Sequence, residues 1–175
     1  MKWIFITLAF LTGLGVLLTL IGLILPRTHQ ATSQVELRQP IDSVWAVIRA
    51  LGETPAFWSE LKSASRLPDS EGKETWGQTM KNGFTLPLVI EEESPPHRLV
   101  TRIAAAPGTP FGGQWIYQLE QVSGGTRVSV TEDGWVSNPF FRVISRIMGY
   151  HTTLDSYLKA LAKKFGESAA PTHRD

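Results

Sequence analysis

The first hydrophobic pattern along the chain is an uninterrupted apolar block. Residues 3–25, WIFITLAFLTGLGVLLTLIGLIL, contain no charged side chain. About 20 such residues are enough for a helix to cross the hydrocarbon core of a bilayer. Lys2 and Arg27 flank the block, and Trp3 occupies a position that suits an interfacial aromatic residue. We therefore expect a transmembrane anchor over residues 1–26, with residues 3–25 contacting the lipid bilayer.

Two other interpretations of the block stay open, namely a buried helix and a cleaved signal peptide. The apolar part of a signal peptide is shorter, about 7–15 residues, and ends at a small-x-small cleavage site. Here the flank reads LPRTHQATS, with His29 three residues before the cut that Ala31 would offer. The basic residues on the two sides nearly balance, so they do not fix the orientation. The expected localisation is a single-pass protein of the bacterial inner membrane.

After a polar linker, expected over residues 27–33, the pattern changes to one typical of strands and short helices. In SQVELRQ, residues 33–39, apolar and charged positions alternate as in a half-buried strand. The following QPIDSVWAVI predicts a short helix that ends at Gly52, and PAFW predicts a second short helix that begins at Pro55.

The middle of the chain is a series of alternating segments separated by turn signals. Asn82–Gly83 is a strong hairpin signal, and Gly124–Gly125 marks another turn. These segments predict about six or seven antiparallel strands. The apolar positions that share a face within a strand are Phe84, Leu86, Leu88 and Ile90, then Trp115, Tyr117 and Leu119, and then Val128 and Val130.

A different period begins at Pro139, where apolar residues recur at steps of three and four up to about Gly166. This spacing predicts one long amphipathic helix. Its apolar stripe consists of Phe140, Ile144, Ile147, Met148, Leu154, Leu158, Leu161 and Phe165. Residues 167–175 are expected to be a disordered tail.

The order of these elements predicts an α+β fold, with one domain over residues 34–166. The sheet is apolar on one face and needs cover. One helix covers a strongly curved sheet only in part, so we expect a cavity between them. The two short helices close one end of it.

This order and four segments are similar to the START-like (SRPBCC) superfamily, and in particular to its polyketide cyclase/dehydrase and lipid-transport group. The segments are QPIDSVWAVI, PAFW, WIYQLEQV with the GGTRVSVTEDG that follows it, and RIMGYHTTLDSYLKALAKKFGE. The resemblance covers about residues 33–166. It implies a helix-grip fold, in which a curved antiparallel sheet wraps around a long C-terminal helix. It also implies an interior pocket for a hydrophobic or amphipathic small molecule such as a lipid, sterol, quinone or polyketide.

Composition and motifs exclude several classes of function. The net charge is +1 with no long run of Lys or Arg, so the chain lacks the basic footprint of a nucleic-acid-binding protein. Cysteine is absent, which excludes disulfides and thiolate metal sites. The four histidines are scattered, and there is neither a nucleophile elbow nor a phosphate loop. We expect no metal and no cofactor, and the sequence does not specify a protein partner.

His151 is the most informative single residue, because at about 100° per residue it falls near the centre of the apolar stripe. A polar ring there needs a partner. The interpretations are a core histidine hydrogen-bonded to the sheet, a ligand-facing donor, and a general base that Asp155 could orient. His151 is thus a weak candidate for catalysis.

The strands carry an aromatic set, Trp76, Trp115, Tyr117 and Trp135, which is either core or pocket wall. Gln78 and Glu132 fall on the inward faces, although a shift of one residue would turn both outward. Arg102 is either an exposed strand arginine or a partner for a ligand carboxylate. The expected ligand-binding residues are Trp76, Gln78, Leu88, Trp115, Tyr117, Glu132, Ile147, Met148 and His151.

Three functions follow from these observations. The first is a membrane-anchored carrier or sensor of a hydrophobic molecule. The second is an enzyme of the cyclase or dehydrase type acting on such a molecule. The third is a protein-interaction module whose groove binds a partner helix or peptide.

Overall fold

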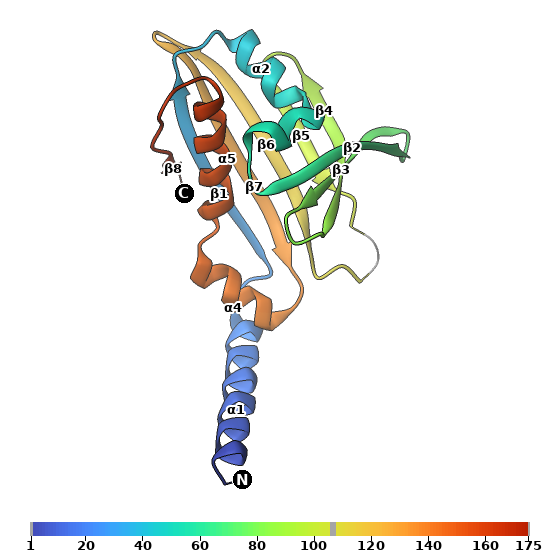
Figure 1. The fold of residues 1–175 in the computed structure, drawn as a ribbon, viewed down its shortest axis with the longest axis vertical. Helices are drawn as coiled ribbons and strands as arrows, with labels where there is room; N and C mark the ends of the chain where they lie inside the picture. The colour runs from blue at the N-terminus through green and yellow to red at the C-terminus, as the bar shows by residue number, and fades with distance from the viewer. Residues whose placement is uncertain (1, 106–107, 175) are drawn as a thin grey trace.

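The computed structural model describes residues 2–105 and 108–174. Within this part of the chain, eight antiparallel strands form one sheet in the order β2-β3-β4-β5-β6-β7-β1-β8 (Figure 1). The strands are β1 (Thr28–Leu37), β2 (Leu61–Ser70), β3 (Lys73–Met80), β4 (Thr85–Ser94), β5 (Arg98–Ile103), β6 (Phe111–Val122), β7 (Gly125–Val136) and β8 (Thr172–Arg174). The predicted α+β, helix-grip architecture is confirmed.

The helices lie at the two ends of the sheet and on its inner face. At one end lie α2 (Ile41–Arg49), the 3-10 helix η1 (Leu51–Glu53) and α3 (Thr54–Phe57). The last two helices are α4 (Pro139–Met148) and α5 (His151–Lys164), and α5 packs on β1 and β7. The apolar helix α1 (Lys2–Ile24) projects away from the sheet, and α4 lies at the junction (Figure 1).

The main core lies between α5 and the strands beneath it. Leu154, Leu158 and Leu161 of α5 are fully buried, and their spacing of four and three residues places them on one face of the helix. They belong to one cluster with the inward-facing residues of the sheet, which include Val35, Leu37, Leu119, Val128 and Val130. The alternation seen in the sequence therefore marks the inner face of these strands correctly.

The prediction of a single C-terminal helix is wrong, because the helix is interrupted at Gly149. This residue has φ of 83°, a left-handed conformation that glycine adopts without the cost a Cβ imposes. Gly149 donates its backbone N–H to the carbonyl of Ser145 and ends α4, and α5 starts at His151 in a new direction. Ile147 and Met148 consequently lie on a different surface from α5, and 75% and 67% of their areas are exposed.

Two segments that were expected to be irregular are strands instead. Most of the expected linker over residues 27–33 belongs to β1, because the pairing of β1 with β7 extends back to Thr28 opposite Trp135. Within the expected disordered tail, residues 172–174 pair with residues 32–34 of β1 as β8. This strand raises the number from the predicted six or seven to eight.

Helix α1 is held against α4 by close packing and by one buried arginine. A Cβ added at Gly22 would lie 1.9 Å from the backbone oxygen of Pro139, so only glycine permits this approach. Arg142 is 4% exposed, and its guanidinium donates to the carbonyl oxygens of Gly22, Leu25, Val136 and Ser137 at 2.7–3.3 Å. Helix α1 and the rest of the protein are therefore joined by a packed contact.

Candidate functional site

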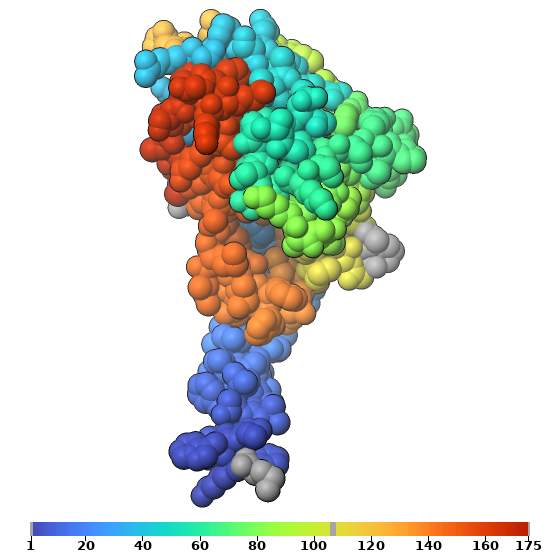
Figure 2. Space-filling model, in the orientation of Figure 1, coloured from blue at the N-terminus to red at the C-terminus, as the bar shows by residue number. Residues whose placement is uncertain are grey.

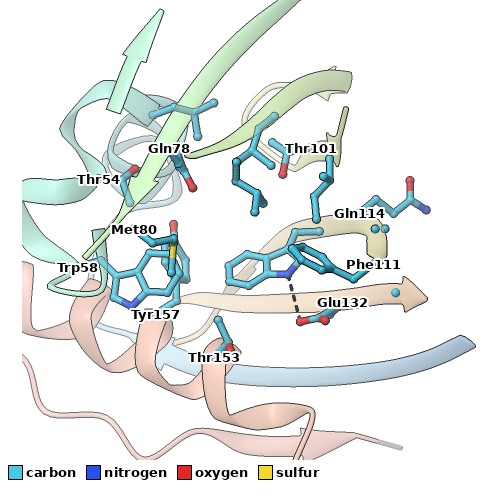
Figure 3. A pocket seen from close by; sticks show the side chains of 18 of the residues that line it. Thr54, Trp58, Gln78, Met80, Thr101, Phe111, Gln114, Glu132, Thr153 and Tyr157 are labelled. Carbon is cyan, nitrogen blue, oxygen red and sulfur yellow. Dashed lines mark hydrogen bonds between the residues drawn. The ribbon is translucent and has the colours of Figure 1, made fainter. Parts of the chain in front are cut away.

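A cavity of about 570 Å³ lies between the sheet and α5. In the surface view a recess opens between the β3–β4 hairpin and the last two helices (Figure 2). Side chains from η1, α3, five strands and α5 line the cavity (Figure 3). They are Leu51, Thr54, Trp58, Gln78, Met80, Asn82, Phe84, Leu86, Leu88, Thr101, Ile103, Phe111, Gln114, Trp115, Tyr117, Glu132, Thr153 and Tyr157, with Gly112, Gly113 and Gly134.

Four aromatic rings form one continuous wall of the cavity. The centroid of Trp58 lies 5.4 Å from that of Tyr157 and 5.9 Å from that of Trp115, and Tyr117 lies 5.8 Å from Tyr157. The Trp58–Tyr157 and Tyr117–Tyr157 pairs are edge-to-face, a favourable geometry for aromatic rings. The Trp58 indole N–H donates to Ser156 Oγ at 3.1 Å, so its polar atom is satisfied outside the wall. The wall therefore presents carbon surface to a guest.

The two tyrosine hydroxyls in this wall stay protonated. Burial raises the pKa of Tyr117, and a side-chain hydrogen bond with Thr101 offsets only part of that rise. Burial also raises the pKa of Tyr157, with a further contribution from the nearby Tyr117. Because neither phenol ionises near neutral pH, each remains a neutral group that can donate or accept a hydrogen bond.

A carboxylate held by two neighbours forms the polar end of the cavity. Glu132 Oε1 lies 3.0 Å from His29 Nε2, and Glu132 Oε2 accepts from the Trp115 indole N–H at 3.3 Å (Figure 3). The His29 ring stacks on Tyr150 with centroids 4.0 Å apart. A Cβ at Gly134 would lie 2.6 Å from this ring, so glycine opposite His29 makes room for it. Among the described lining residues, Glu132 is the only carboxylate, and it still has lone pairs for a guest.

Five of the nine ligand-binding residues expected from the sequence border this cavity. They are Gln78, Leu88, Trp115, Tyr117 and Glu132. The other four lie elsewhere. Trp76 packs beneath Gly52 of η1 and donates its indole N–H to Glu74 at 2.6 Å. Ile147 and Met148 are exposed on α4, because the helix break changes the direction of their face.

His151 faces β1 and β8 rather than the cavity. Its Nδ1 lies 3.2 Å from Ser33 Oγ, and its ring stacks on His173 with centroids 3.9 Å apart. Ser33 also donates to Asp155 at 2.7 Å, and the Asp155 carboxylate lies 3.0 Å from His173 Nε2. Of the three interpretations of His151, this arrangement matches the histidine hydrogen-bonded to the sheet.

Outside this cluster, the remaining candidates have simple partners. Arg102 is half-buried and lies outside the lining of this cavity, and its Nε donates to Glu91 at 2.6 Å. Within residues 2–105 and 108–174, no three His, Asp or Glu side chains converge in a way that would hold a metal ion.

The sequence interpretation did not include three important residues of the site. Tyr157 follows Leu154 by three residues, so helical spacing was a signal that could have placed it on the buried face. Trp58 was assigned to a short helix, but that assignment gave no indication of a cavity wall. His29 was placed in the linker, and only the strand pairing of β1 with β7 reveals that it reaches Glu132.

A curved antiparallel sheet closed by a C-terminal helix over an apolar cavity defines the START-like class of hydrophobic-ligand-binding domains. The family model for polyketide cyclase / dehydrase and lipid transport matches residues 28–165, and the chain belongs to this family. No curated protein gives a significant sequence match.

Solved structures of low sequence identity share the fold. A START superfamily protein from Mycobacterium smegmatis superposes with a TM-score of 0.62 at 14% identity, covering 79% of this chain and 97% of that one. A conserved protein from Geobacillus kaustophilus gives 0.60 at 15% identity, covering 83% and 100%. The di-domain ARO/CYC StfQ from the steffimycin biosynthetic pathway gives 0.62 at 9% identity, covering 79% of this chain and 52% of StfQ. At these identities the similarity establishes the fold alone.

Proposed function

We propose that this protein is a membrane-anchored domain that binds a hydrophobic or amphipathic small molecule, as a carrier or sensor. The observation that carries the proposal is the cavity of about 570 Å³, which lies within the size range of ligand sites. Its aromatic and aliphatic walls favour an apolar guest, and its few polar groups are placed at separate points to orient one. Membership of a lipid-transport and cyclase family supports the same interpretation.

The polar groups indicate the chemistry of the guest. Glu132 offers carboxylate oxygens that only accept hydrogen bonds, so it favours a donor such as a hydroxyl or amine and disfavours an anionic head group. Gln78 and Thr101 lie on β3 and β5 as further neutral partners. An apolar molecule with one donor group fits this arrangement best.

Helix α1 supports the membrane part of the proposal. It has 23 residues, and its span of about 35 Å at 1.5 Å per residue exceeds the hydrocarbon thickness of about 30 Å. The helix is long and apolar enough to cross a membrane, and none of its most hydrophobic window is buried inside the protein. A signal sequence near the N-terminus would pass the same test, so the mass of the mature chain distinguishes the two.

The test of ligand binding compares the full chain with a variant whose cavity is filled. Leu86→Trp and Ile103→Trp together add bulk at two half-buried wall positions, whereas Gln118→Trp adds a similar ring at an exposed position of β6 outside the lining. Lipid extraction and mass spectrometry of the three detergent-purified proteins should recover a hydrophobic molecule that only the double variant lacks. Lipid held by α1 should be recovered from all three proteins alike. The proposal is rejected if every hydrophobic molecule is recovered in equal amounts from the three proteins.

A second candidate function is catalysis on the bound molecule, of the cyclase or dehydrase type. It is favoured by the carboxylate–imidazole pair of Glu132 and His29, whose atoms lie 3.0 Å apart beside the cavity. Such a pair can take up a proton from a guest and hold it on the imidazole. In Glu132→Gln an enzyme would accumulate a different bound molecule, for instance one richer by the elements of water. A carrier would yield the same molecule, in a smaller amount.

A further inference from the structure

Helix α4 carries an apolar face that the protein itself does not cover. Phe141, Ile147 and Met148 expose 50%, 75% and 67% of their areas. At about 100° per residue these three side chains, together with Phe140 and Ile144, fall within an arc of about 120°. Exposure of this apolar face to water is unfavourable, which indicates that another molecule covers it.

The packing of α4 on α1 fixes where this face lies. Pro139 contacts Gly22, close to the end of α1 at Ile24, and Arg142 donates to the carbonyls of Gly22 and Leu25. Because nearly all of α1 is needed to span a bilayer, its last turn lies at the boundary between hydrocarbon and head groups. Helix α4 is therefore attached at the level of that boundary.

The apolar face of α4 is directed along α1 toward the bilayer. Phe140 borders a shallow hollow with Thr12, Gly15, Val16, Thr19 and Leu20, all of which precede Gly22 on α1. Ile147 follows Phe140 by seven residues and so lies on the same side of the helix. The exposed residues of this face consequently point toward the membrane rather than toward the ligand domain.

The charges around this junction fit an anionic surface. Residues 1–35 and 134–154 contain Lys2, Arg27, Arg142 and Arg146, and no Asp or Glu. Arg27 is exposed and lies near the end of α1, and Arg146 is exposed on α4. A helix with an apolar face and neighbouring basic residues is the pattern of an interfacial membrane helix.

We propose that α4 lies in the head-group region of an anionic phospholipid bilayer, as a second membrane contact beside α1. This inference rests on the proposed role of α1 as an anchor. Its consequence concerns the cavity, because the lining residue Phe111 pairs with Val136, whose N–H donates to the carbonyl of Arg27 at 2.8 Å. The end of the cavity at Phe111 therefore adjoins the membrane. A guest can pass between bilayer and cavity over a short path.

The absence of cysteine makes the inference directly testable, since single-cysteine variants of the full chain take one label each. Ile147→Cys reports on the α4 face, Lys159→Cys on an exposed helical position of α5, and Leu11→Cys on the middle of α1. Each variant is labelled with an environment-sensitive fluorophore and reconstituted in phosphatidylcholine–phosphatidylglycerol vesicles containing a lipid-borne doxyl quencher. The labels at 11 and 147 should lose most of their fluorescence, and the label at 159 should keep it.

The outcomes separate this inference from the proposals on which it rests. Quenching at 11 without quenching at 147 overturns the interfacial helix and leaves the anchor intact. An unquenched label at 11 overturns the anchor and the inference together. Ligand recovery from the cavity-filled variant is independent of both results, so a failure of ligand binding is recognised separately.

Discussion

The guanidinium of Arg142 donates from Nη1 to the backbone carbonyl of Gly22 at 2.9 Å and so ties the ligand-binding domain to the end of α1. The last carbonyls of a helix have no partner within it and carry partial negative charge. A buried cation that satisfies them with charge-assisted hydrogen bonds is therefore favourable at this position. This contact makes the orientation of the domain relative to α1 a fixed property of the fold.

The close contact at Gly22 predicts that one added methyl group lowers the stability of the protein at this position but not at a similar glycine of α1. In Gly22→Ala the new Cβ would overlap the backbone of Pro139, and overpacking of this kind costs about 1–3 kcal/mol. Gly15→Ala is the matched control, because a Cβ at Gly15 has no atom within 4 Å. Thermal unfolding of the full chain in detergent should show a lower midpoint for Gly22→Ala alone. Equal midpoints would mean that the two helices do not pack as described.

Glu132 should determine which head group the cavity accepts. Glu132→Gln keeps the shape of the side chain but removes the charge that makes it a strong acceptor, and a hydrogen bond to a charged group contributes about 1.5–3 kcal/mol. We expect dodecanol to bind about 10- to 100-fold more weakly to the variant, and dodecyl methyl ether, which has no donor, to be nearly unaffected. Indole emission provides the measurement, since Trp58 and Trp115 line the cavity.

The control for this experiment is Asp133→Asn, which changes a neighbouring carboxylate outside the cavity lining. It should bind both probes as the unmodified chain does. The role of Glu132 is refuted if the ratio of the two affinities is the same in Glu132→Gln as in the unmodified chain.

Acid should weaken the contact between α2 and β3. Arg49 donates to both carboxylate oxygens of Glu74, at 2.7 and 3.1 Å, and this hydrogen bonding lowers the pKa of Glu74. A lowered folded-state pKa contributes stability above the unfolded value and loses it as the pH falls through the folded value. The pair is partly exposed to solvent, so we expect it to contribute about 1 kcal/mol to the free energy of unfolding.

The measurement is the thermal midpoint of Glu74→Gln as the pH is lowered from neutral to below the usual range of a glutamate. The variant should start lower and converge with the unmodified chain in acid. Glu120→Gln, which changes a largely exposed carboxylate, serves as the comparison. Parallel curves for Glu74→Gln and the unmodified chain would show that the Arg49 contact does not shift the titration.

The buried phenol of Tyr157 should affect stability at the opposite end of the pH scale. Burial raises its folded-state pKa above the unfolded value of about 10. The associated stability is present below that value and is lost as the pH rises above it, because only the unfolded chain can then ionise. Tyr157→Phe should therefore lose less stability between neutral and strongly alkaline pH. An unchanged alkaline decline of the thermal midpoint would indicate that the phenol is solvated.

The sequence predicted the strands and their inner face well, because alternation is a direct consequence of strand geometry. The inward placement of Gln78, Leu88, Trp115, Tyr117 and Glu132 followed from this alternation. The hairpin at Asn82–Gly83 was equally accessible, and β3 and β4 are joined there. These features depend on local rules that operate over a few residues.

The helix break and the partner of Glu132 could not be predicted from local sequence patterns. A glycine inside a helical pattern costs only about 1 kcal/mol, so the residues around Gly149 fitted one continuous helix. The break is evident only in the structure, where Gly149 has a φ of 83° and α4 packs on α1. His29 meets Glu132 across 103 positions of sequence, a contact that pattern analysis within one segment does not reach.

The short strand β8 has a consequence for how copies of the protein coexist. It occupies residues 32–34 on the open side of β1 and divides the unpaired backbone there into residues 28–31 and 35–37. On the opposite rim, β2 carries Lys62, Arg66, Pro68 and Asp69, which discourage a neighbouring strand from adding to it. Neighbouring copies of the protein are thus protected against edge-to-edge polymerisation of their sheets.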